Sequence, residues 1–461
     1  MPILMAAIVP HPPIILPEIG KGQEWEIRGT TAAYKEVARR VREKKPETIV
    51  VLSPHATSYA DYFHISPGTK ARGDFSRFGA KQVEVTAFYD EEFSKALEVA
   101  AKRAGIPAGT QGEREKTLDH GTMIPLTFLA EKELPCAIVR IGLSGMDAVT
   151  HYRLGKCIKK VSDDLNRDVV IIASGDLSHK LLESGPYGYA EEGPVFDKAV
   201  TKAMVEGDFF TMMTFDPHLC DAAAECGLGS FEIMAGTFDR VRVKSELLSY
   251  EGPFGVGYAV AAFEPEEADE SRAFDVRCQQ AERERIGAIR EREDAYTRLA
   301  RRIVEAFVKT GQMPPLTDDL PEEMKKEQAG VFVSLKIQSK LRGCIGTISA
   351  VTGSIAEEIQ RNAVSACSQD PRFEPVTADE LERIHYSVDV LGKAERIESV
   401  NQLDAKRYGV IVTSGYHKGL LLPNLEGVDT VEEQLKIAKQ KAGIPESERC
   451  RMERFEVVRH T

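Results

Sequence analysis

The sequence predicts an α/β protein with a helix-covered, mostly parallel sheet in its N-terminal part and a smaller C-terminal α+β domain. The apolar runs Ile3 to Val9, Thr48 to Ser53 and Val169 to Ser174 have the length and β-branched content of strands buried on both faces. Helical stretches separate these runs, as parallel strands require. The pattern then changes to hairpins mixed with helices, which indicates an α+β sheet with its own core.

Strands and helices alternate along the first domain. A helical stretch at residues 26–44 carries an apolar stripe of Ala33, Val37 and Val41 and leads into the second strand. Residues 56–86 have no strong periodicity and carry several Gly and Pro residues, so we expect a lid or site wall there. The other predicted elements are helices at 91–104, 118–129, 148–165, 195–205 and 221–238, a strand at 136–141, and an antiparallel pair at 242–250 and 255–263.

We place the first domain at residues 1–265, a charged linker at 266–293 and the second domain at 294–461. Glu, Asp and Arg dominate the linker and almost no apolar stripe runs through it, which predicts partly disordered chain and partly solvated helix. In the second domain we predict helices at 296–307, 355–367 and 431–442, a turn at 338–340, and strands at 330–337, 341–348, 385–391, 409–413, 420–422 and 455–459.

Composition narrows the class of protein. The chain has 461 residues, of which 42% are hydrophobic and 29% charged, as in ordinary globular proteins. Its 60 basic and 72 acidic residues give a formal charge of -12, which argues against partners such as nucleic acid or an acidic membrane surface. No run approaches the ~20 apolar residues of a membrane span. The eight cysteines include no Cys-x-x-Cys pair, so we expect a cytoplasmic protein without a disulfide framework or a cysteine-bound cluster.

Each of the three apolar strands is followed by a histidine. His11 and His55 each come directly after a proline at the end of a strand, and His179 follows the third strand after the polar turn Gly175 to Ser178. The carboxyl ends of parallel strands share one edge of a sheet, where ligands bind. Neutral imidazole is the commonest metal ligand, so we expect His11 and His55, on adjacent strands, to be a ligand pair. A third ligand must come from later in the chain, and a carboxylate in that place suits ferrous iron.

His179 has a different predicted role because a polar turn precedes it. Groups in such a turn can fix the tautomer and the orientation of an imidazole. We therefore assign His179 as a general acid or base, with Asp176 as one of its orienting groups.

The stretch LRGCIGT in the second domain places two glycines within a predicted strand. Such glycines indicate a bulge or a surface that another group approaches closely. One interpretation is a catalytic site in which Arg342 holds an anion and Cys344 is a nucleophile, with Asp370 and Arg372 of a charged turn beside them. The alternative is that Cys344 packs in the interior and the glycines make room for the helix at 355–367.

Four motifs resemble the LigB-like class III extradiol dioxygenase superfamily, including its Memo-like branch. They are PHPP at His11, SPHA at His55, DHG at His120 and SGDLSH at His179. The dioxygenases of this superfamily bind non-haem ferrous iron through two histidines and a glutamate, cleave catechols beside one hydroxyl, and use a further histidine as acid/base. The resemblance implies that His11 and His55 bind the metal, that His179 is the acid/base, and that His120 lines the pocket.

The third ligand differs between the two branches, being a carboxylate in the dioxygenases and a thiol in the Memo-like proteins. Here Glu225 and Cys226 stand side by side. Neighbours on a helix point about 100° apart, so only one of them faces the metal. Glu225 favours iron and oxygen chemistry, whereas Cys226 favours zinc or copper, unless it is simply a small buried side chain. We favour Glu225.

The stretch LRGCIGT, with the DPRF turn and the sequence GLLLP, resembles the AMMECR domain family over residues 294–461. A Memo-like domain fused to an AMMECR-like domain resembles a component of the AmmeMemoRadiSam systems, whose third member is a radical SAM protein. The resemblance implies ferrous iron, a small aromatic or phenolic substrate and a radical SAM partner. Two alternatives stay open, a zinc-dependent enzyme that uses no oxygen and a non-catalytic metal or ligand carrier. Whether the chain forms a homo-oligomer is also open.

Overall fold

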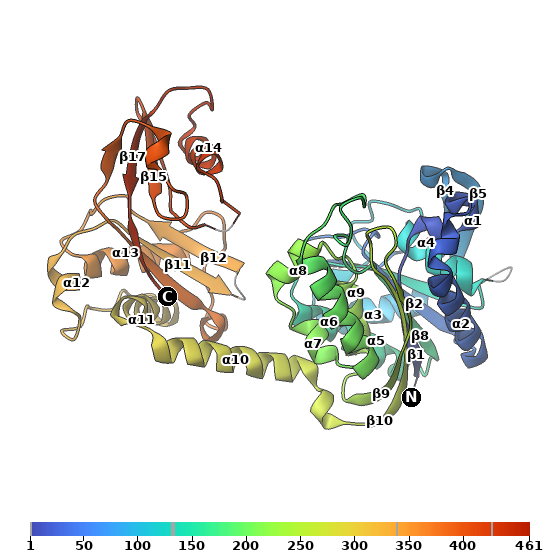
Figure 1. Cartoon of the computed structure of the whole chain (residues 1–461). Coiled ribbons are helices and arrows are strands. Elements are labelled where there is room, and N and C mark those ends of the chain that lie inside the picture. The colour runs from blue at the N-terminus through green and yellow to red at the C-terminus, as the bar shows by residue number, and fades with distance from the viewer. Residues whose placement is uncertain (1, 131–133, 338–339, 426) are drawn as a thin grey trace. The chain divides into compact units, whose positions relative to one another are not determined.

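The computed structural model describes residues 2–130, 134–337, 340–425 and 427–461. The chain divides into two compact units, Met1–Gln279 and Gln280–Thr461, which Figure 1 colours from blue to red along the chain. The predicted fold class is confirmed, with a mostly parallel sheet and helices in the first unit and antiparallel sheets and helices in the second. Within the described ranges, no helix is long and apolar enough to cross a membrane.

A six-stranded sheet forms the centre of the first unit, in the order β7-β2-β8-β1-β10-β9. The first four strands of this order are parallel, β10 is antiparallel to β1, and β9 is antiparallel to β10. The predicted adjacency of the first two strands is wrong, because β8 lies between β1 and β2 and pairs with both. The strands are β1 (Ile3–Val9), β2 (Thr48–Ser53), β7 (Ala137–Gly142), β8 (Val169–Ser174), β9 (Val241–Glu251) and β10 (Tyr258–Ala268).

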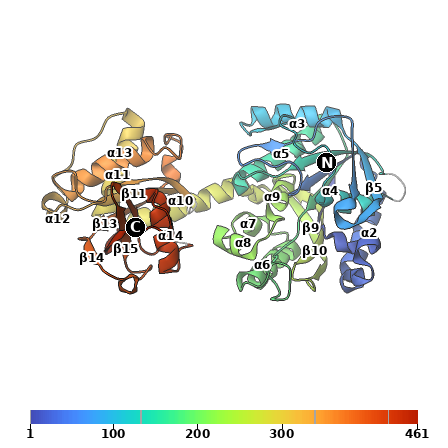
Figure 2. The same cartoon turned by 90° about the horizontal axis from the view of Figure 1, so that it is seen from above.

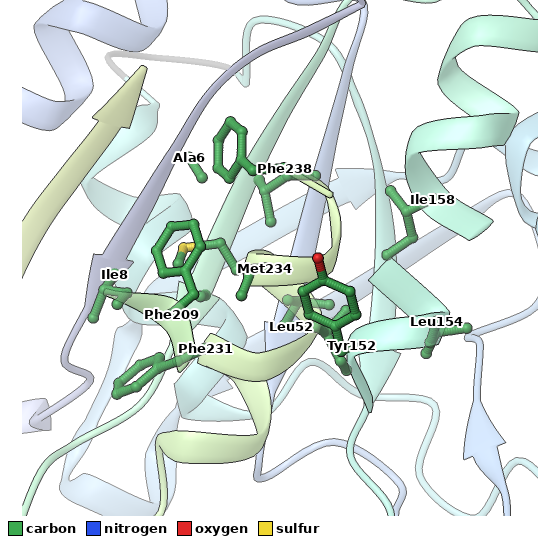
Figure 3. Packing of buried hydrophobic residues seen from close by; sticks show 14 of the residues in the cluster. Ala6, Ile8, Leu52, Tyr152, Leu154, Ile158, Phe209, Phe231, Met234 and Phe238 are labelled. Carbon is green, nitrogen blue, oxygen red and sulfur yellow. The ribbon is translucent and has the colours of Figure 1, made fainter. Parts of the chain in front are cut away.

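Helices cover both faces of this sheet, as Figure 2 shows from above. On one face lie α3 (Glu91–Arg103), α5 (Ala148–Asp164), α6 (Glu192–Glu206), α7 (Phe209–Met213) and α9 (Leu228–Gly236), and on the other α2 (Arg28–Lys44) and α4 (His120–Leu129). Successive side chains of a strand point to opposite faces. Ala6 and Ile8 of β1 therefore pack with Phe209 in the first core, seen in Figure 3, while Met5 and Ala7 pack in the second.

Short elements after β1 and β2 differ most from the prediction. Residues 56–86 are not irregular throughout, because they contain the hairpin β4 (Lys70–Phe75) and β5 (Ala80–Phe88), joined by the 3-10 turn η3 (Ser76–Phe78). β5 buries Val85 and Ala87 while the residues beside them are exposed. Charged and polar side chains on its exposed face made the alternation too weak to predict a strand. The other short elements are η1 (Pro13–Ile15), α1 (Pro17–Gly20), η2 (Gln23–Ile27) and the paired strands β3 (Phe63–His64) and β6 (Ala108–Gly109).

The helix predicted at 221–238 is broken into two. α8 (Pro217–Ala223) ends at Ala224, whose φ of 52° lies in the left-handed region, and α9 begins only at Leu228. A left-handed residue stops the helical path and turns the chain. Glu225 and Cys226 therefore lie in a turn between two helices and not on a helix.

The second unit contains two four-stranded antiparallel sheets, in the orders β12-β11-β13-β18 and β14-β17-β15-β16. Their strands are β11 (Val331–Ile337), β12 (Lys340–Gly346), β13 (His385–Leu391), β14 (Glu395–Ile397), β15 (Gly409–Ser414), β16 (His417–Leu421), β17 (Arg451–Phe455) and β18 (Val457–His460). The helices α11 (Ala295–Thr310), α12 (Glu322–Lys326) and α13 (Ile355–Ser368) pack on the first sheet, and α14 (Val431–Ala442) packs on the second. Of the predicted turn at 338–340, residues 338 and 339 lie outside the described residues.

Helix α10 (Phe274–Arg292) crosses the division between the units, which falls between Gln279 and Gln280. β10 continues to Ala268, and the short turn η4 (Glu270–Arg272) precedes α10. The residues assigned to a charged linker thus form the end of a strand, a turn and a helix.

Candidate metal centre

Three side chains from distant parts of the first unit meet beyond the carboxyl ends of the parallel strands. His11 lies two residues after β1, His55 two residues after β2, and Cys226 in the turn between α8 and α9. One ligand atom of each lies within 4.8 Å of the others, and no second group of this kind is found in the part of the chain that the structure describes. We call these three residues the His-His-Cys cluster.

The spacing within the His-His-Cys cluster fits a single metal ion. The two Nε2 atoms of the histidines are 3.0 Å apart, and Sγ of Cys226 is 3.7 Å from Nε2 of His11. Tetrahedral zinc, with bonds of about 2.0 Å to nitrogen and about 2.3 Å to sulfur, would place two nitrogen ligands about 3.3 Å apart and a nitrogen and a sulfur ligand about 3.5 Å apart. Three protein ligands also leave a fourth position open, as catalytic metal sites do.

Polar contacts from three elements orient His11. Its Nδ1 lies 3.0 Å from the hydroxyl of Ser174 at the end of β8, and its backbone N–H donates to Oδ1 of Asp176 at 2.8 Å. The hydroxyl of Tyr34 on α2 donates to the carbonyl of Pro10, directly before His11. With its proton on Nδ1, the imidazole presents the lone pair of Nε2 to a metal, which is the usual effect of such outer partners.

Asp119 connects the loop of His55 to the interior of the unit. Its carboxylate accepts hydrogen bonds from the Ser53 hydroxyl at 2.6 Å and from the backbone N–H of Thr122 at 2.9 Å. The Ser53 hydroxyl accepts from the backbone N–H of His55 at 3.2 Å, and the buried Arg140 lies 3.9 Å from Asp119. Burial acts to raise the pKa of Asp119, but these hydrogen bonds and the charge of Arg140 outweigh it and lower the pKa. An ionised carboxylate is therefore held beside the cluster.

Glu225 and Cys226 have different surroundings. Sγ of Cys226 faces His11 and accepts a hydrogen bond from the backbone N–H of Asp176 at 3.3 Å. The carboxylate of Glu225 points to α9 instead, where it accepts from the backbone N–H of Leu228 at 2.7 Å. The structure thus brings Cys226 to the two histidines, whereas the sequence favoured Glu225. Burial raises the pKa of the Cys226 thiol, and a coordinated metal ion would displace its proton.

His120 borders the cluster without belonging to it. It begins α4, and its ring centre is 4.1 Å from that of His55. Burial lowers the pKa of His11, His55 and His120, that of His120 to about 3. These imidazoles are therefore neutral at physiological pH, which is the form that binds a metal.

Asp176 is turned toward His11 and not toward His179. Its Oδ2 lies 3.8 Å from Nε2 of His11, and burial raises its pKa to about 6. Nδ1 of His179 is buried and has no hydrogen-bond partner among the described residues. Asp176 therefore does not hydrogen-bond to Nδ1 of His179. The ring of His179 instead meets Tyr187 edge-on at 5.1 Å.

In the second unit, Arg342 is already paired with a carboxylate. Its Nε lies 2.6 Å from Oε1 of Glu380 and its Nη2 lies 3.0 Å from Oε2 of the same side chain. Such a two-point contact occupies one edge of the guanidinium, and Nη1 and Nη2 also donate to the carbonyls of Glu374 and Pro375 at 2.9 and 3.4 Å. The donors of Arg342 that an anionic ligand would use are therefore already paired.

Cys344, Asp370 and Arg372 do lie together. The carboxylate of Asp370 accepts from the backbone N–H of Cys344 at 2.9 Å and from Nε of Arg372 at 2.9 Å. Burial raises the pKa of the Cys344 thiol, which disfavours a nucleophilic thiolate. A Cβ added to Gly343 would lie 2.3 Å from the carbonyl oxygen of Ala366, so this glycine makes room for α13. These contacts favour the packing interpretation of the stretch.

Several supporting residues were missed by sequence reasoning. Asp119 stands inside the DHG motif, and Arg140 is the one charged residue in the apolar strand AIVRIG. The sequence therefore indicates that both residues have a role beyond packing. Ser174 is the last residue of a predicted strand, and nothing in the sequence indicates its contact with Nδ1 of His11. Phe78 and Tyr187 come from segments without periodicity, so the sequence does not indicate that either lies near the site. The ring centre of Phe78 lies 5.3 Å from that of His120, and the ring centre of Tyr187 lies 5.1 Å from that of His179.

Comparison with known proteins assigns both parts of the chain to known families. Residues 5–261 match the family described as the catalytic LigB subunit of aromatic ring-opening dioxygenase. The chain belongs to this LigB family. Residues 297–460 match the AMMECR1 family, so the predicted resemblance is confirmed for both parts of the LigB–AMMECR1 chain.

Relatives of the LigB–AMMECR1 chain match the whole of it or one part. A Clostridium acetobutylicum protein is 40% identical over 461 residues, which cover 98% of each chain. A Thermotoga maritima protein is 48% identical over 170 residues, covering 36% of this chain and 98% of its own. A crystal structure from Pyrococcus horikoshii shares 33% identity at a TM-score of 0.34 and covers 36% of this chain and 88% of its own.

Proposed function

We propose that the first unit is a metal-dependent enzyme that acts on a small aromatic or phenolic molecule. The observation that carries the proposal is the convergence of His11, His55 and Cys226 beyond the parallel strands. Membership of a family described as a catalytic subunit of ring-opening dioxygenases supports the aromatic class of substrate.

The side chains around the cluster have distinct roles in this proposal. A bound ion would polarise the oxygen atoms of the substrate and make a substrate hydroxyl more acidic. His179 would take that proton through Nε2, because its Nδ1 is buried away from solvent. His120 would line the pocket beside His55, and Asp176 would hold the backbone of His11 in place.

The proposal has two versions that differ in the metal. Ferrous iron used with oxygen corresponds to ring-opening chemistry, whereas zinc corresponds to non-oxidative chemistry on the same substrate class. One observation supports the zinc version. The thiol of Cys226, and not the carboxylate of Glu225, lies at the histidines. A thiolate is a softer ligand and favours zinc or copper over hard cations.

We also propose a radical SAM protein as the partner of the chain, on the basis of the fusion of LigB and AMMECR1 parts. In the non-catalytic alternative the chain carries a metal or ligand to that partner. Co-purification of the full chain with a radical SAM protein encoded beside its gene tests the partnership. Loss of the complex on His11→Ala, in a chain without turnover, would favour the carrier over the enzyme.

Oxygen uptake tests the enzymatic proposal. The full chain is purified anaerobically, its metal content is measured, and the iron-loaded form is offered a panel of catechols. The dioxygenase version predicts uptake that falls roughly 100-fold or more in His179→Asn while the metal content stays unchanged. Absence of uptake together with one zinc ion per chain would remove the dioxygenase version and support the non-oxidative one. Absence of any bound metal would remove both.

A further inference from the structure

We propose that Phe78 and Tyr187 are the specificity-determining walls of the substrate site, and that they select a planar aromatic ring bound at the His-His-Cys cluster. The inference rests on the proposed function and extends it to two residues that no motif marks. Both side chains are large and apolar, and both are exposed, Phe78 to 39% and Tyr187 to 55%. Phe78 contacts His120, which borders the cluster, and Tyr187 contacts His179, the proposed acid/base.

Phe78 reaches the cluster from the hairpin of β4 and β5. Its ring centre lies 5.3 Å from that of His120 at an interplanar angle of 63°, and His120 in turn lies 4.1 Å from His55. The buried ring of Phe75 supports Phe78 from below at 6.3 Å. Gly79, with φ of 78°, ends the 3-10 turn and fixes where the ring emerges. The ring of Phe78 is thus held in place by its neighbours, while part of its surface stays exposed and can contact a ligand.

Tyr187 comes from the loop after His179 and contacts the His179 ring. The two rings meet edge-on at 5.1 Å and 85°. The loop is held by the Lys180 ammonium, which donates to the carbonyl of Tyr187, and by the backbone N–H of Ala190, which donates to the carbonyl of Lys180 at 3.1 Å. The backbone N–H of His179 donates to the carbonyl of Ala223 at 3.0 Å, which ties His179 to the segment that leads into Cys226.

Phe78 is therefore linked to the cluster by ring contacts that lead through His120 to His55 and His11. Tyr187 is linked to it through His179, whose backbone is bonded to Ala223 just before Cys226. A flat ring that binds the metal through adjacent oxygens would contact aromatic surface that is otherwise in water. Aromatic contacts of this kind strengthen binding by roughly threefold to tenfold each.

Two metal-binding ligands that differ only in the ring test this inference. Benzohydroxamate and acetohydroxamate share the same chelating group, and only the first carries an aromatic ring. Both are titrated calorimetrically into the full chain loaded with one Zn²⁺ per chain, with metal content checked after the titration. We expect the wild-type chain to bind benzohydroxamate roughly tenfold or more tightly than acetohydroxamate. Phe78→Ala and Tyr187→Ala should each reduce that ratio roughly threefold to tenfold.

Matched variants separate this effect from a general loss of structure. Phe88→Ala removes an aromatic side chain of the same hairpin that is 63% exposed, and Tyr189→Ala removes one of the same loop that is 45% exposed. Both should keep the wild-type ratio, as should Tyr187→Phe, and the affinity for acetohydroxamate should stay constant throughout. If the Phe78 and Tyr187 variants keep the wild-type ratio, or if the wild-type chain binds both ligands equally, this inference is overturned. If neither ligand binds, the proposed metal-centred function is overturned with it.

Discussion

Metal binding by this chain should release one proton per ion above neutral pH, and that proton should come from Cys226. Burial lowers the pKa of His11 and His55, so both imidazoles are already neutral and have no proton to give. Burial raises the pKa of the Cys226 thiol, so it is protonated until a metal replaces the proton. Asp176, whose pKa burial raises to about 6, is ionised above neutral pH and does not contribute there.

The pH dependence of the metal affinity follows from the number of protons released per ion. One proton released per ion makes the affinity rise tenfold per pH unit, or about 1.4 kcal/mol, between about pH 7.5 and 8.5. Below its pKa of about 6, Asp176 takes up a proton, and the negative charge 3.8 Å from Nε2 of His11 disappears. The affinity should therefore fall more steeply with acid in that range than above neutral pH.

Calorimetric titration of Zn²⁺ in two buffers of different ionisation enthalpy measures the proton count directly. Cys226→Ser should bind the ion more than about 100-fold more weakly and release no proton, because loss of an outer partner alone costs about 10- to 100-fold. Glu225→Gln is the matched control, since an amide oxygen can still accept from the backbone N–H of Leu228. Release of zero or two protons per ion by the wild-type chain, or loss of proton release in Glu225→Gln, would contradict release of a single proton from Cys226.

Four further predictions concern other parts of the chain. His179→Asn should lower turnover by about 10²- to 10⁴-fold while metal analysis still finds the wild-type content; an equal loss of metal would contradict an acid/base role. Burial raises the pKa of Asp197 from 3.8 to about 6, so the fold loses about 3 kcal/mol as pH rises through that window. Asp197→Asn should remove this loss in urea unfolding at pH 4 and pH 7, and an unchanged pH dependence would count against it. Gly343→Ala should destabilise the fold by about 1–3 kcal/mol because of the clash with the Ala366 carbonyl. At Gly287 in α10 an added Cβ meets nothing within 4 Å, so Gly287→Ala should stabilise the fold by roughly 0.5–1 kcal/mol. Thermal unfolding measures both glycine variants, and equal changes in the two would contradict the clash at Gly343.

The bounds of the strands that carry the site could be predicted from the sequence, but their order in the sheet could not. The three apolar runs before His11, His55 and His179 became β1, β2 and β8 with unchanged bounds, because strands buried on both faces are uniformly apolar and end sharply. Their order could not be read locally. β8 enters the sheet between β1 and β2, and such a pairing depends on packing between segments more than a hundred residues apart.

The third ligand was misjudged for a local reason. Three successive alanines before Glu225 favour a continuous helix, and nothing in the sequence indicates that Ala224 adopts a left-handed φ of 52°. That single residue turns Glu225 toward α9 and Cys226 toward His11. Asp119 and Arg140 could have been found from an acidic residue in a motif and a charge in an apolar strand. Phe78 and Tyr187 could not, because they lie in a turn and a loop that only the folded chain brings to the cluster.

An anomalous diffraction map of anaerobically prepared, metal-containing crystals would locate the metal ion and its ligands. We predict one peak bound by Nε2 of His11, Nε2 of His55 and Sγ of Cys226, at about 2.0–2.3 Å from each. The absorption edge of the same crystals identifies the metal. A peak bound by the carboxylate of Glu225, or a peak that remains at full height in Cys226→Ser crystals, would contradict the account.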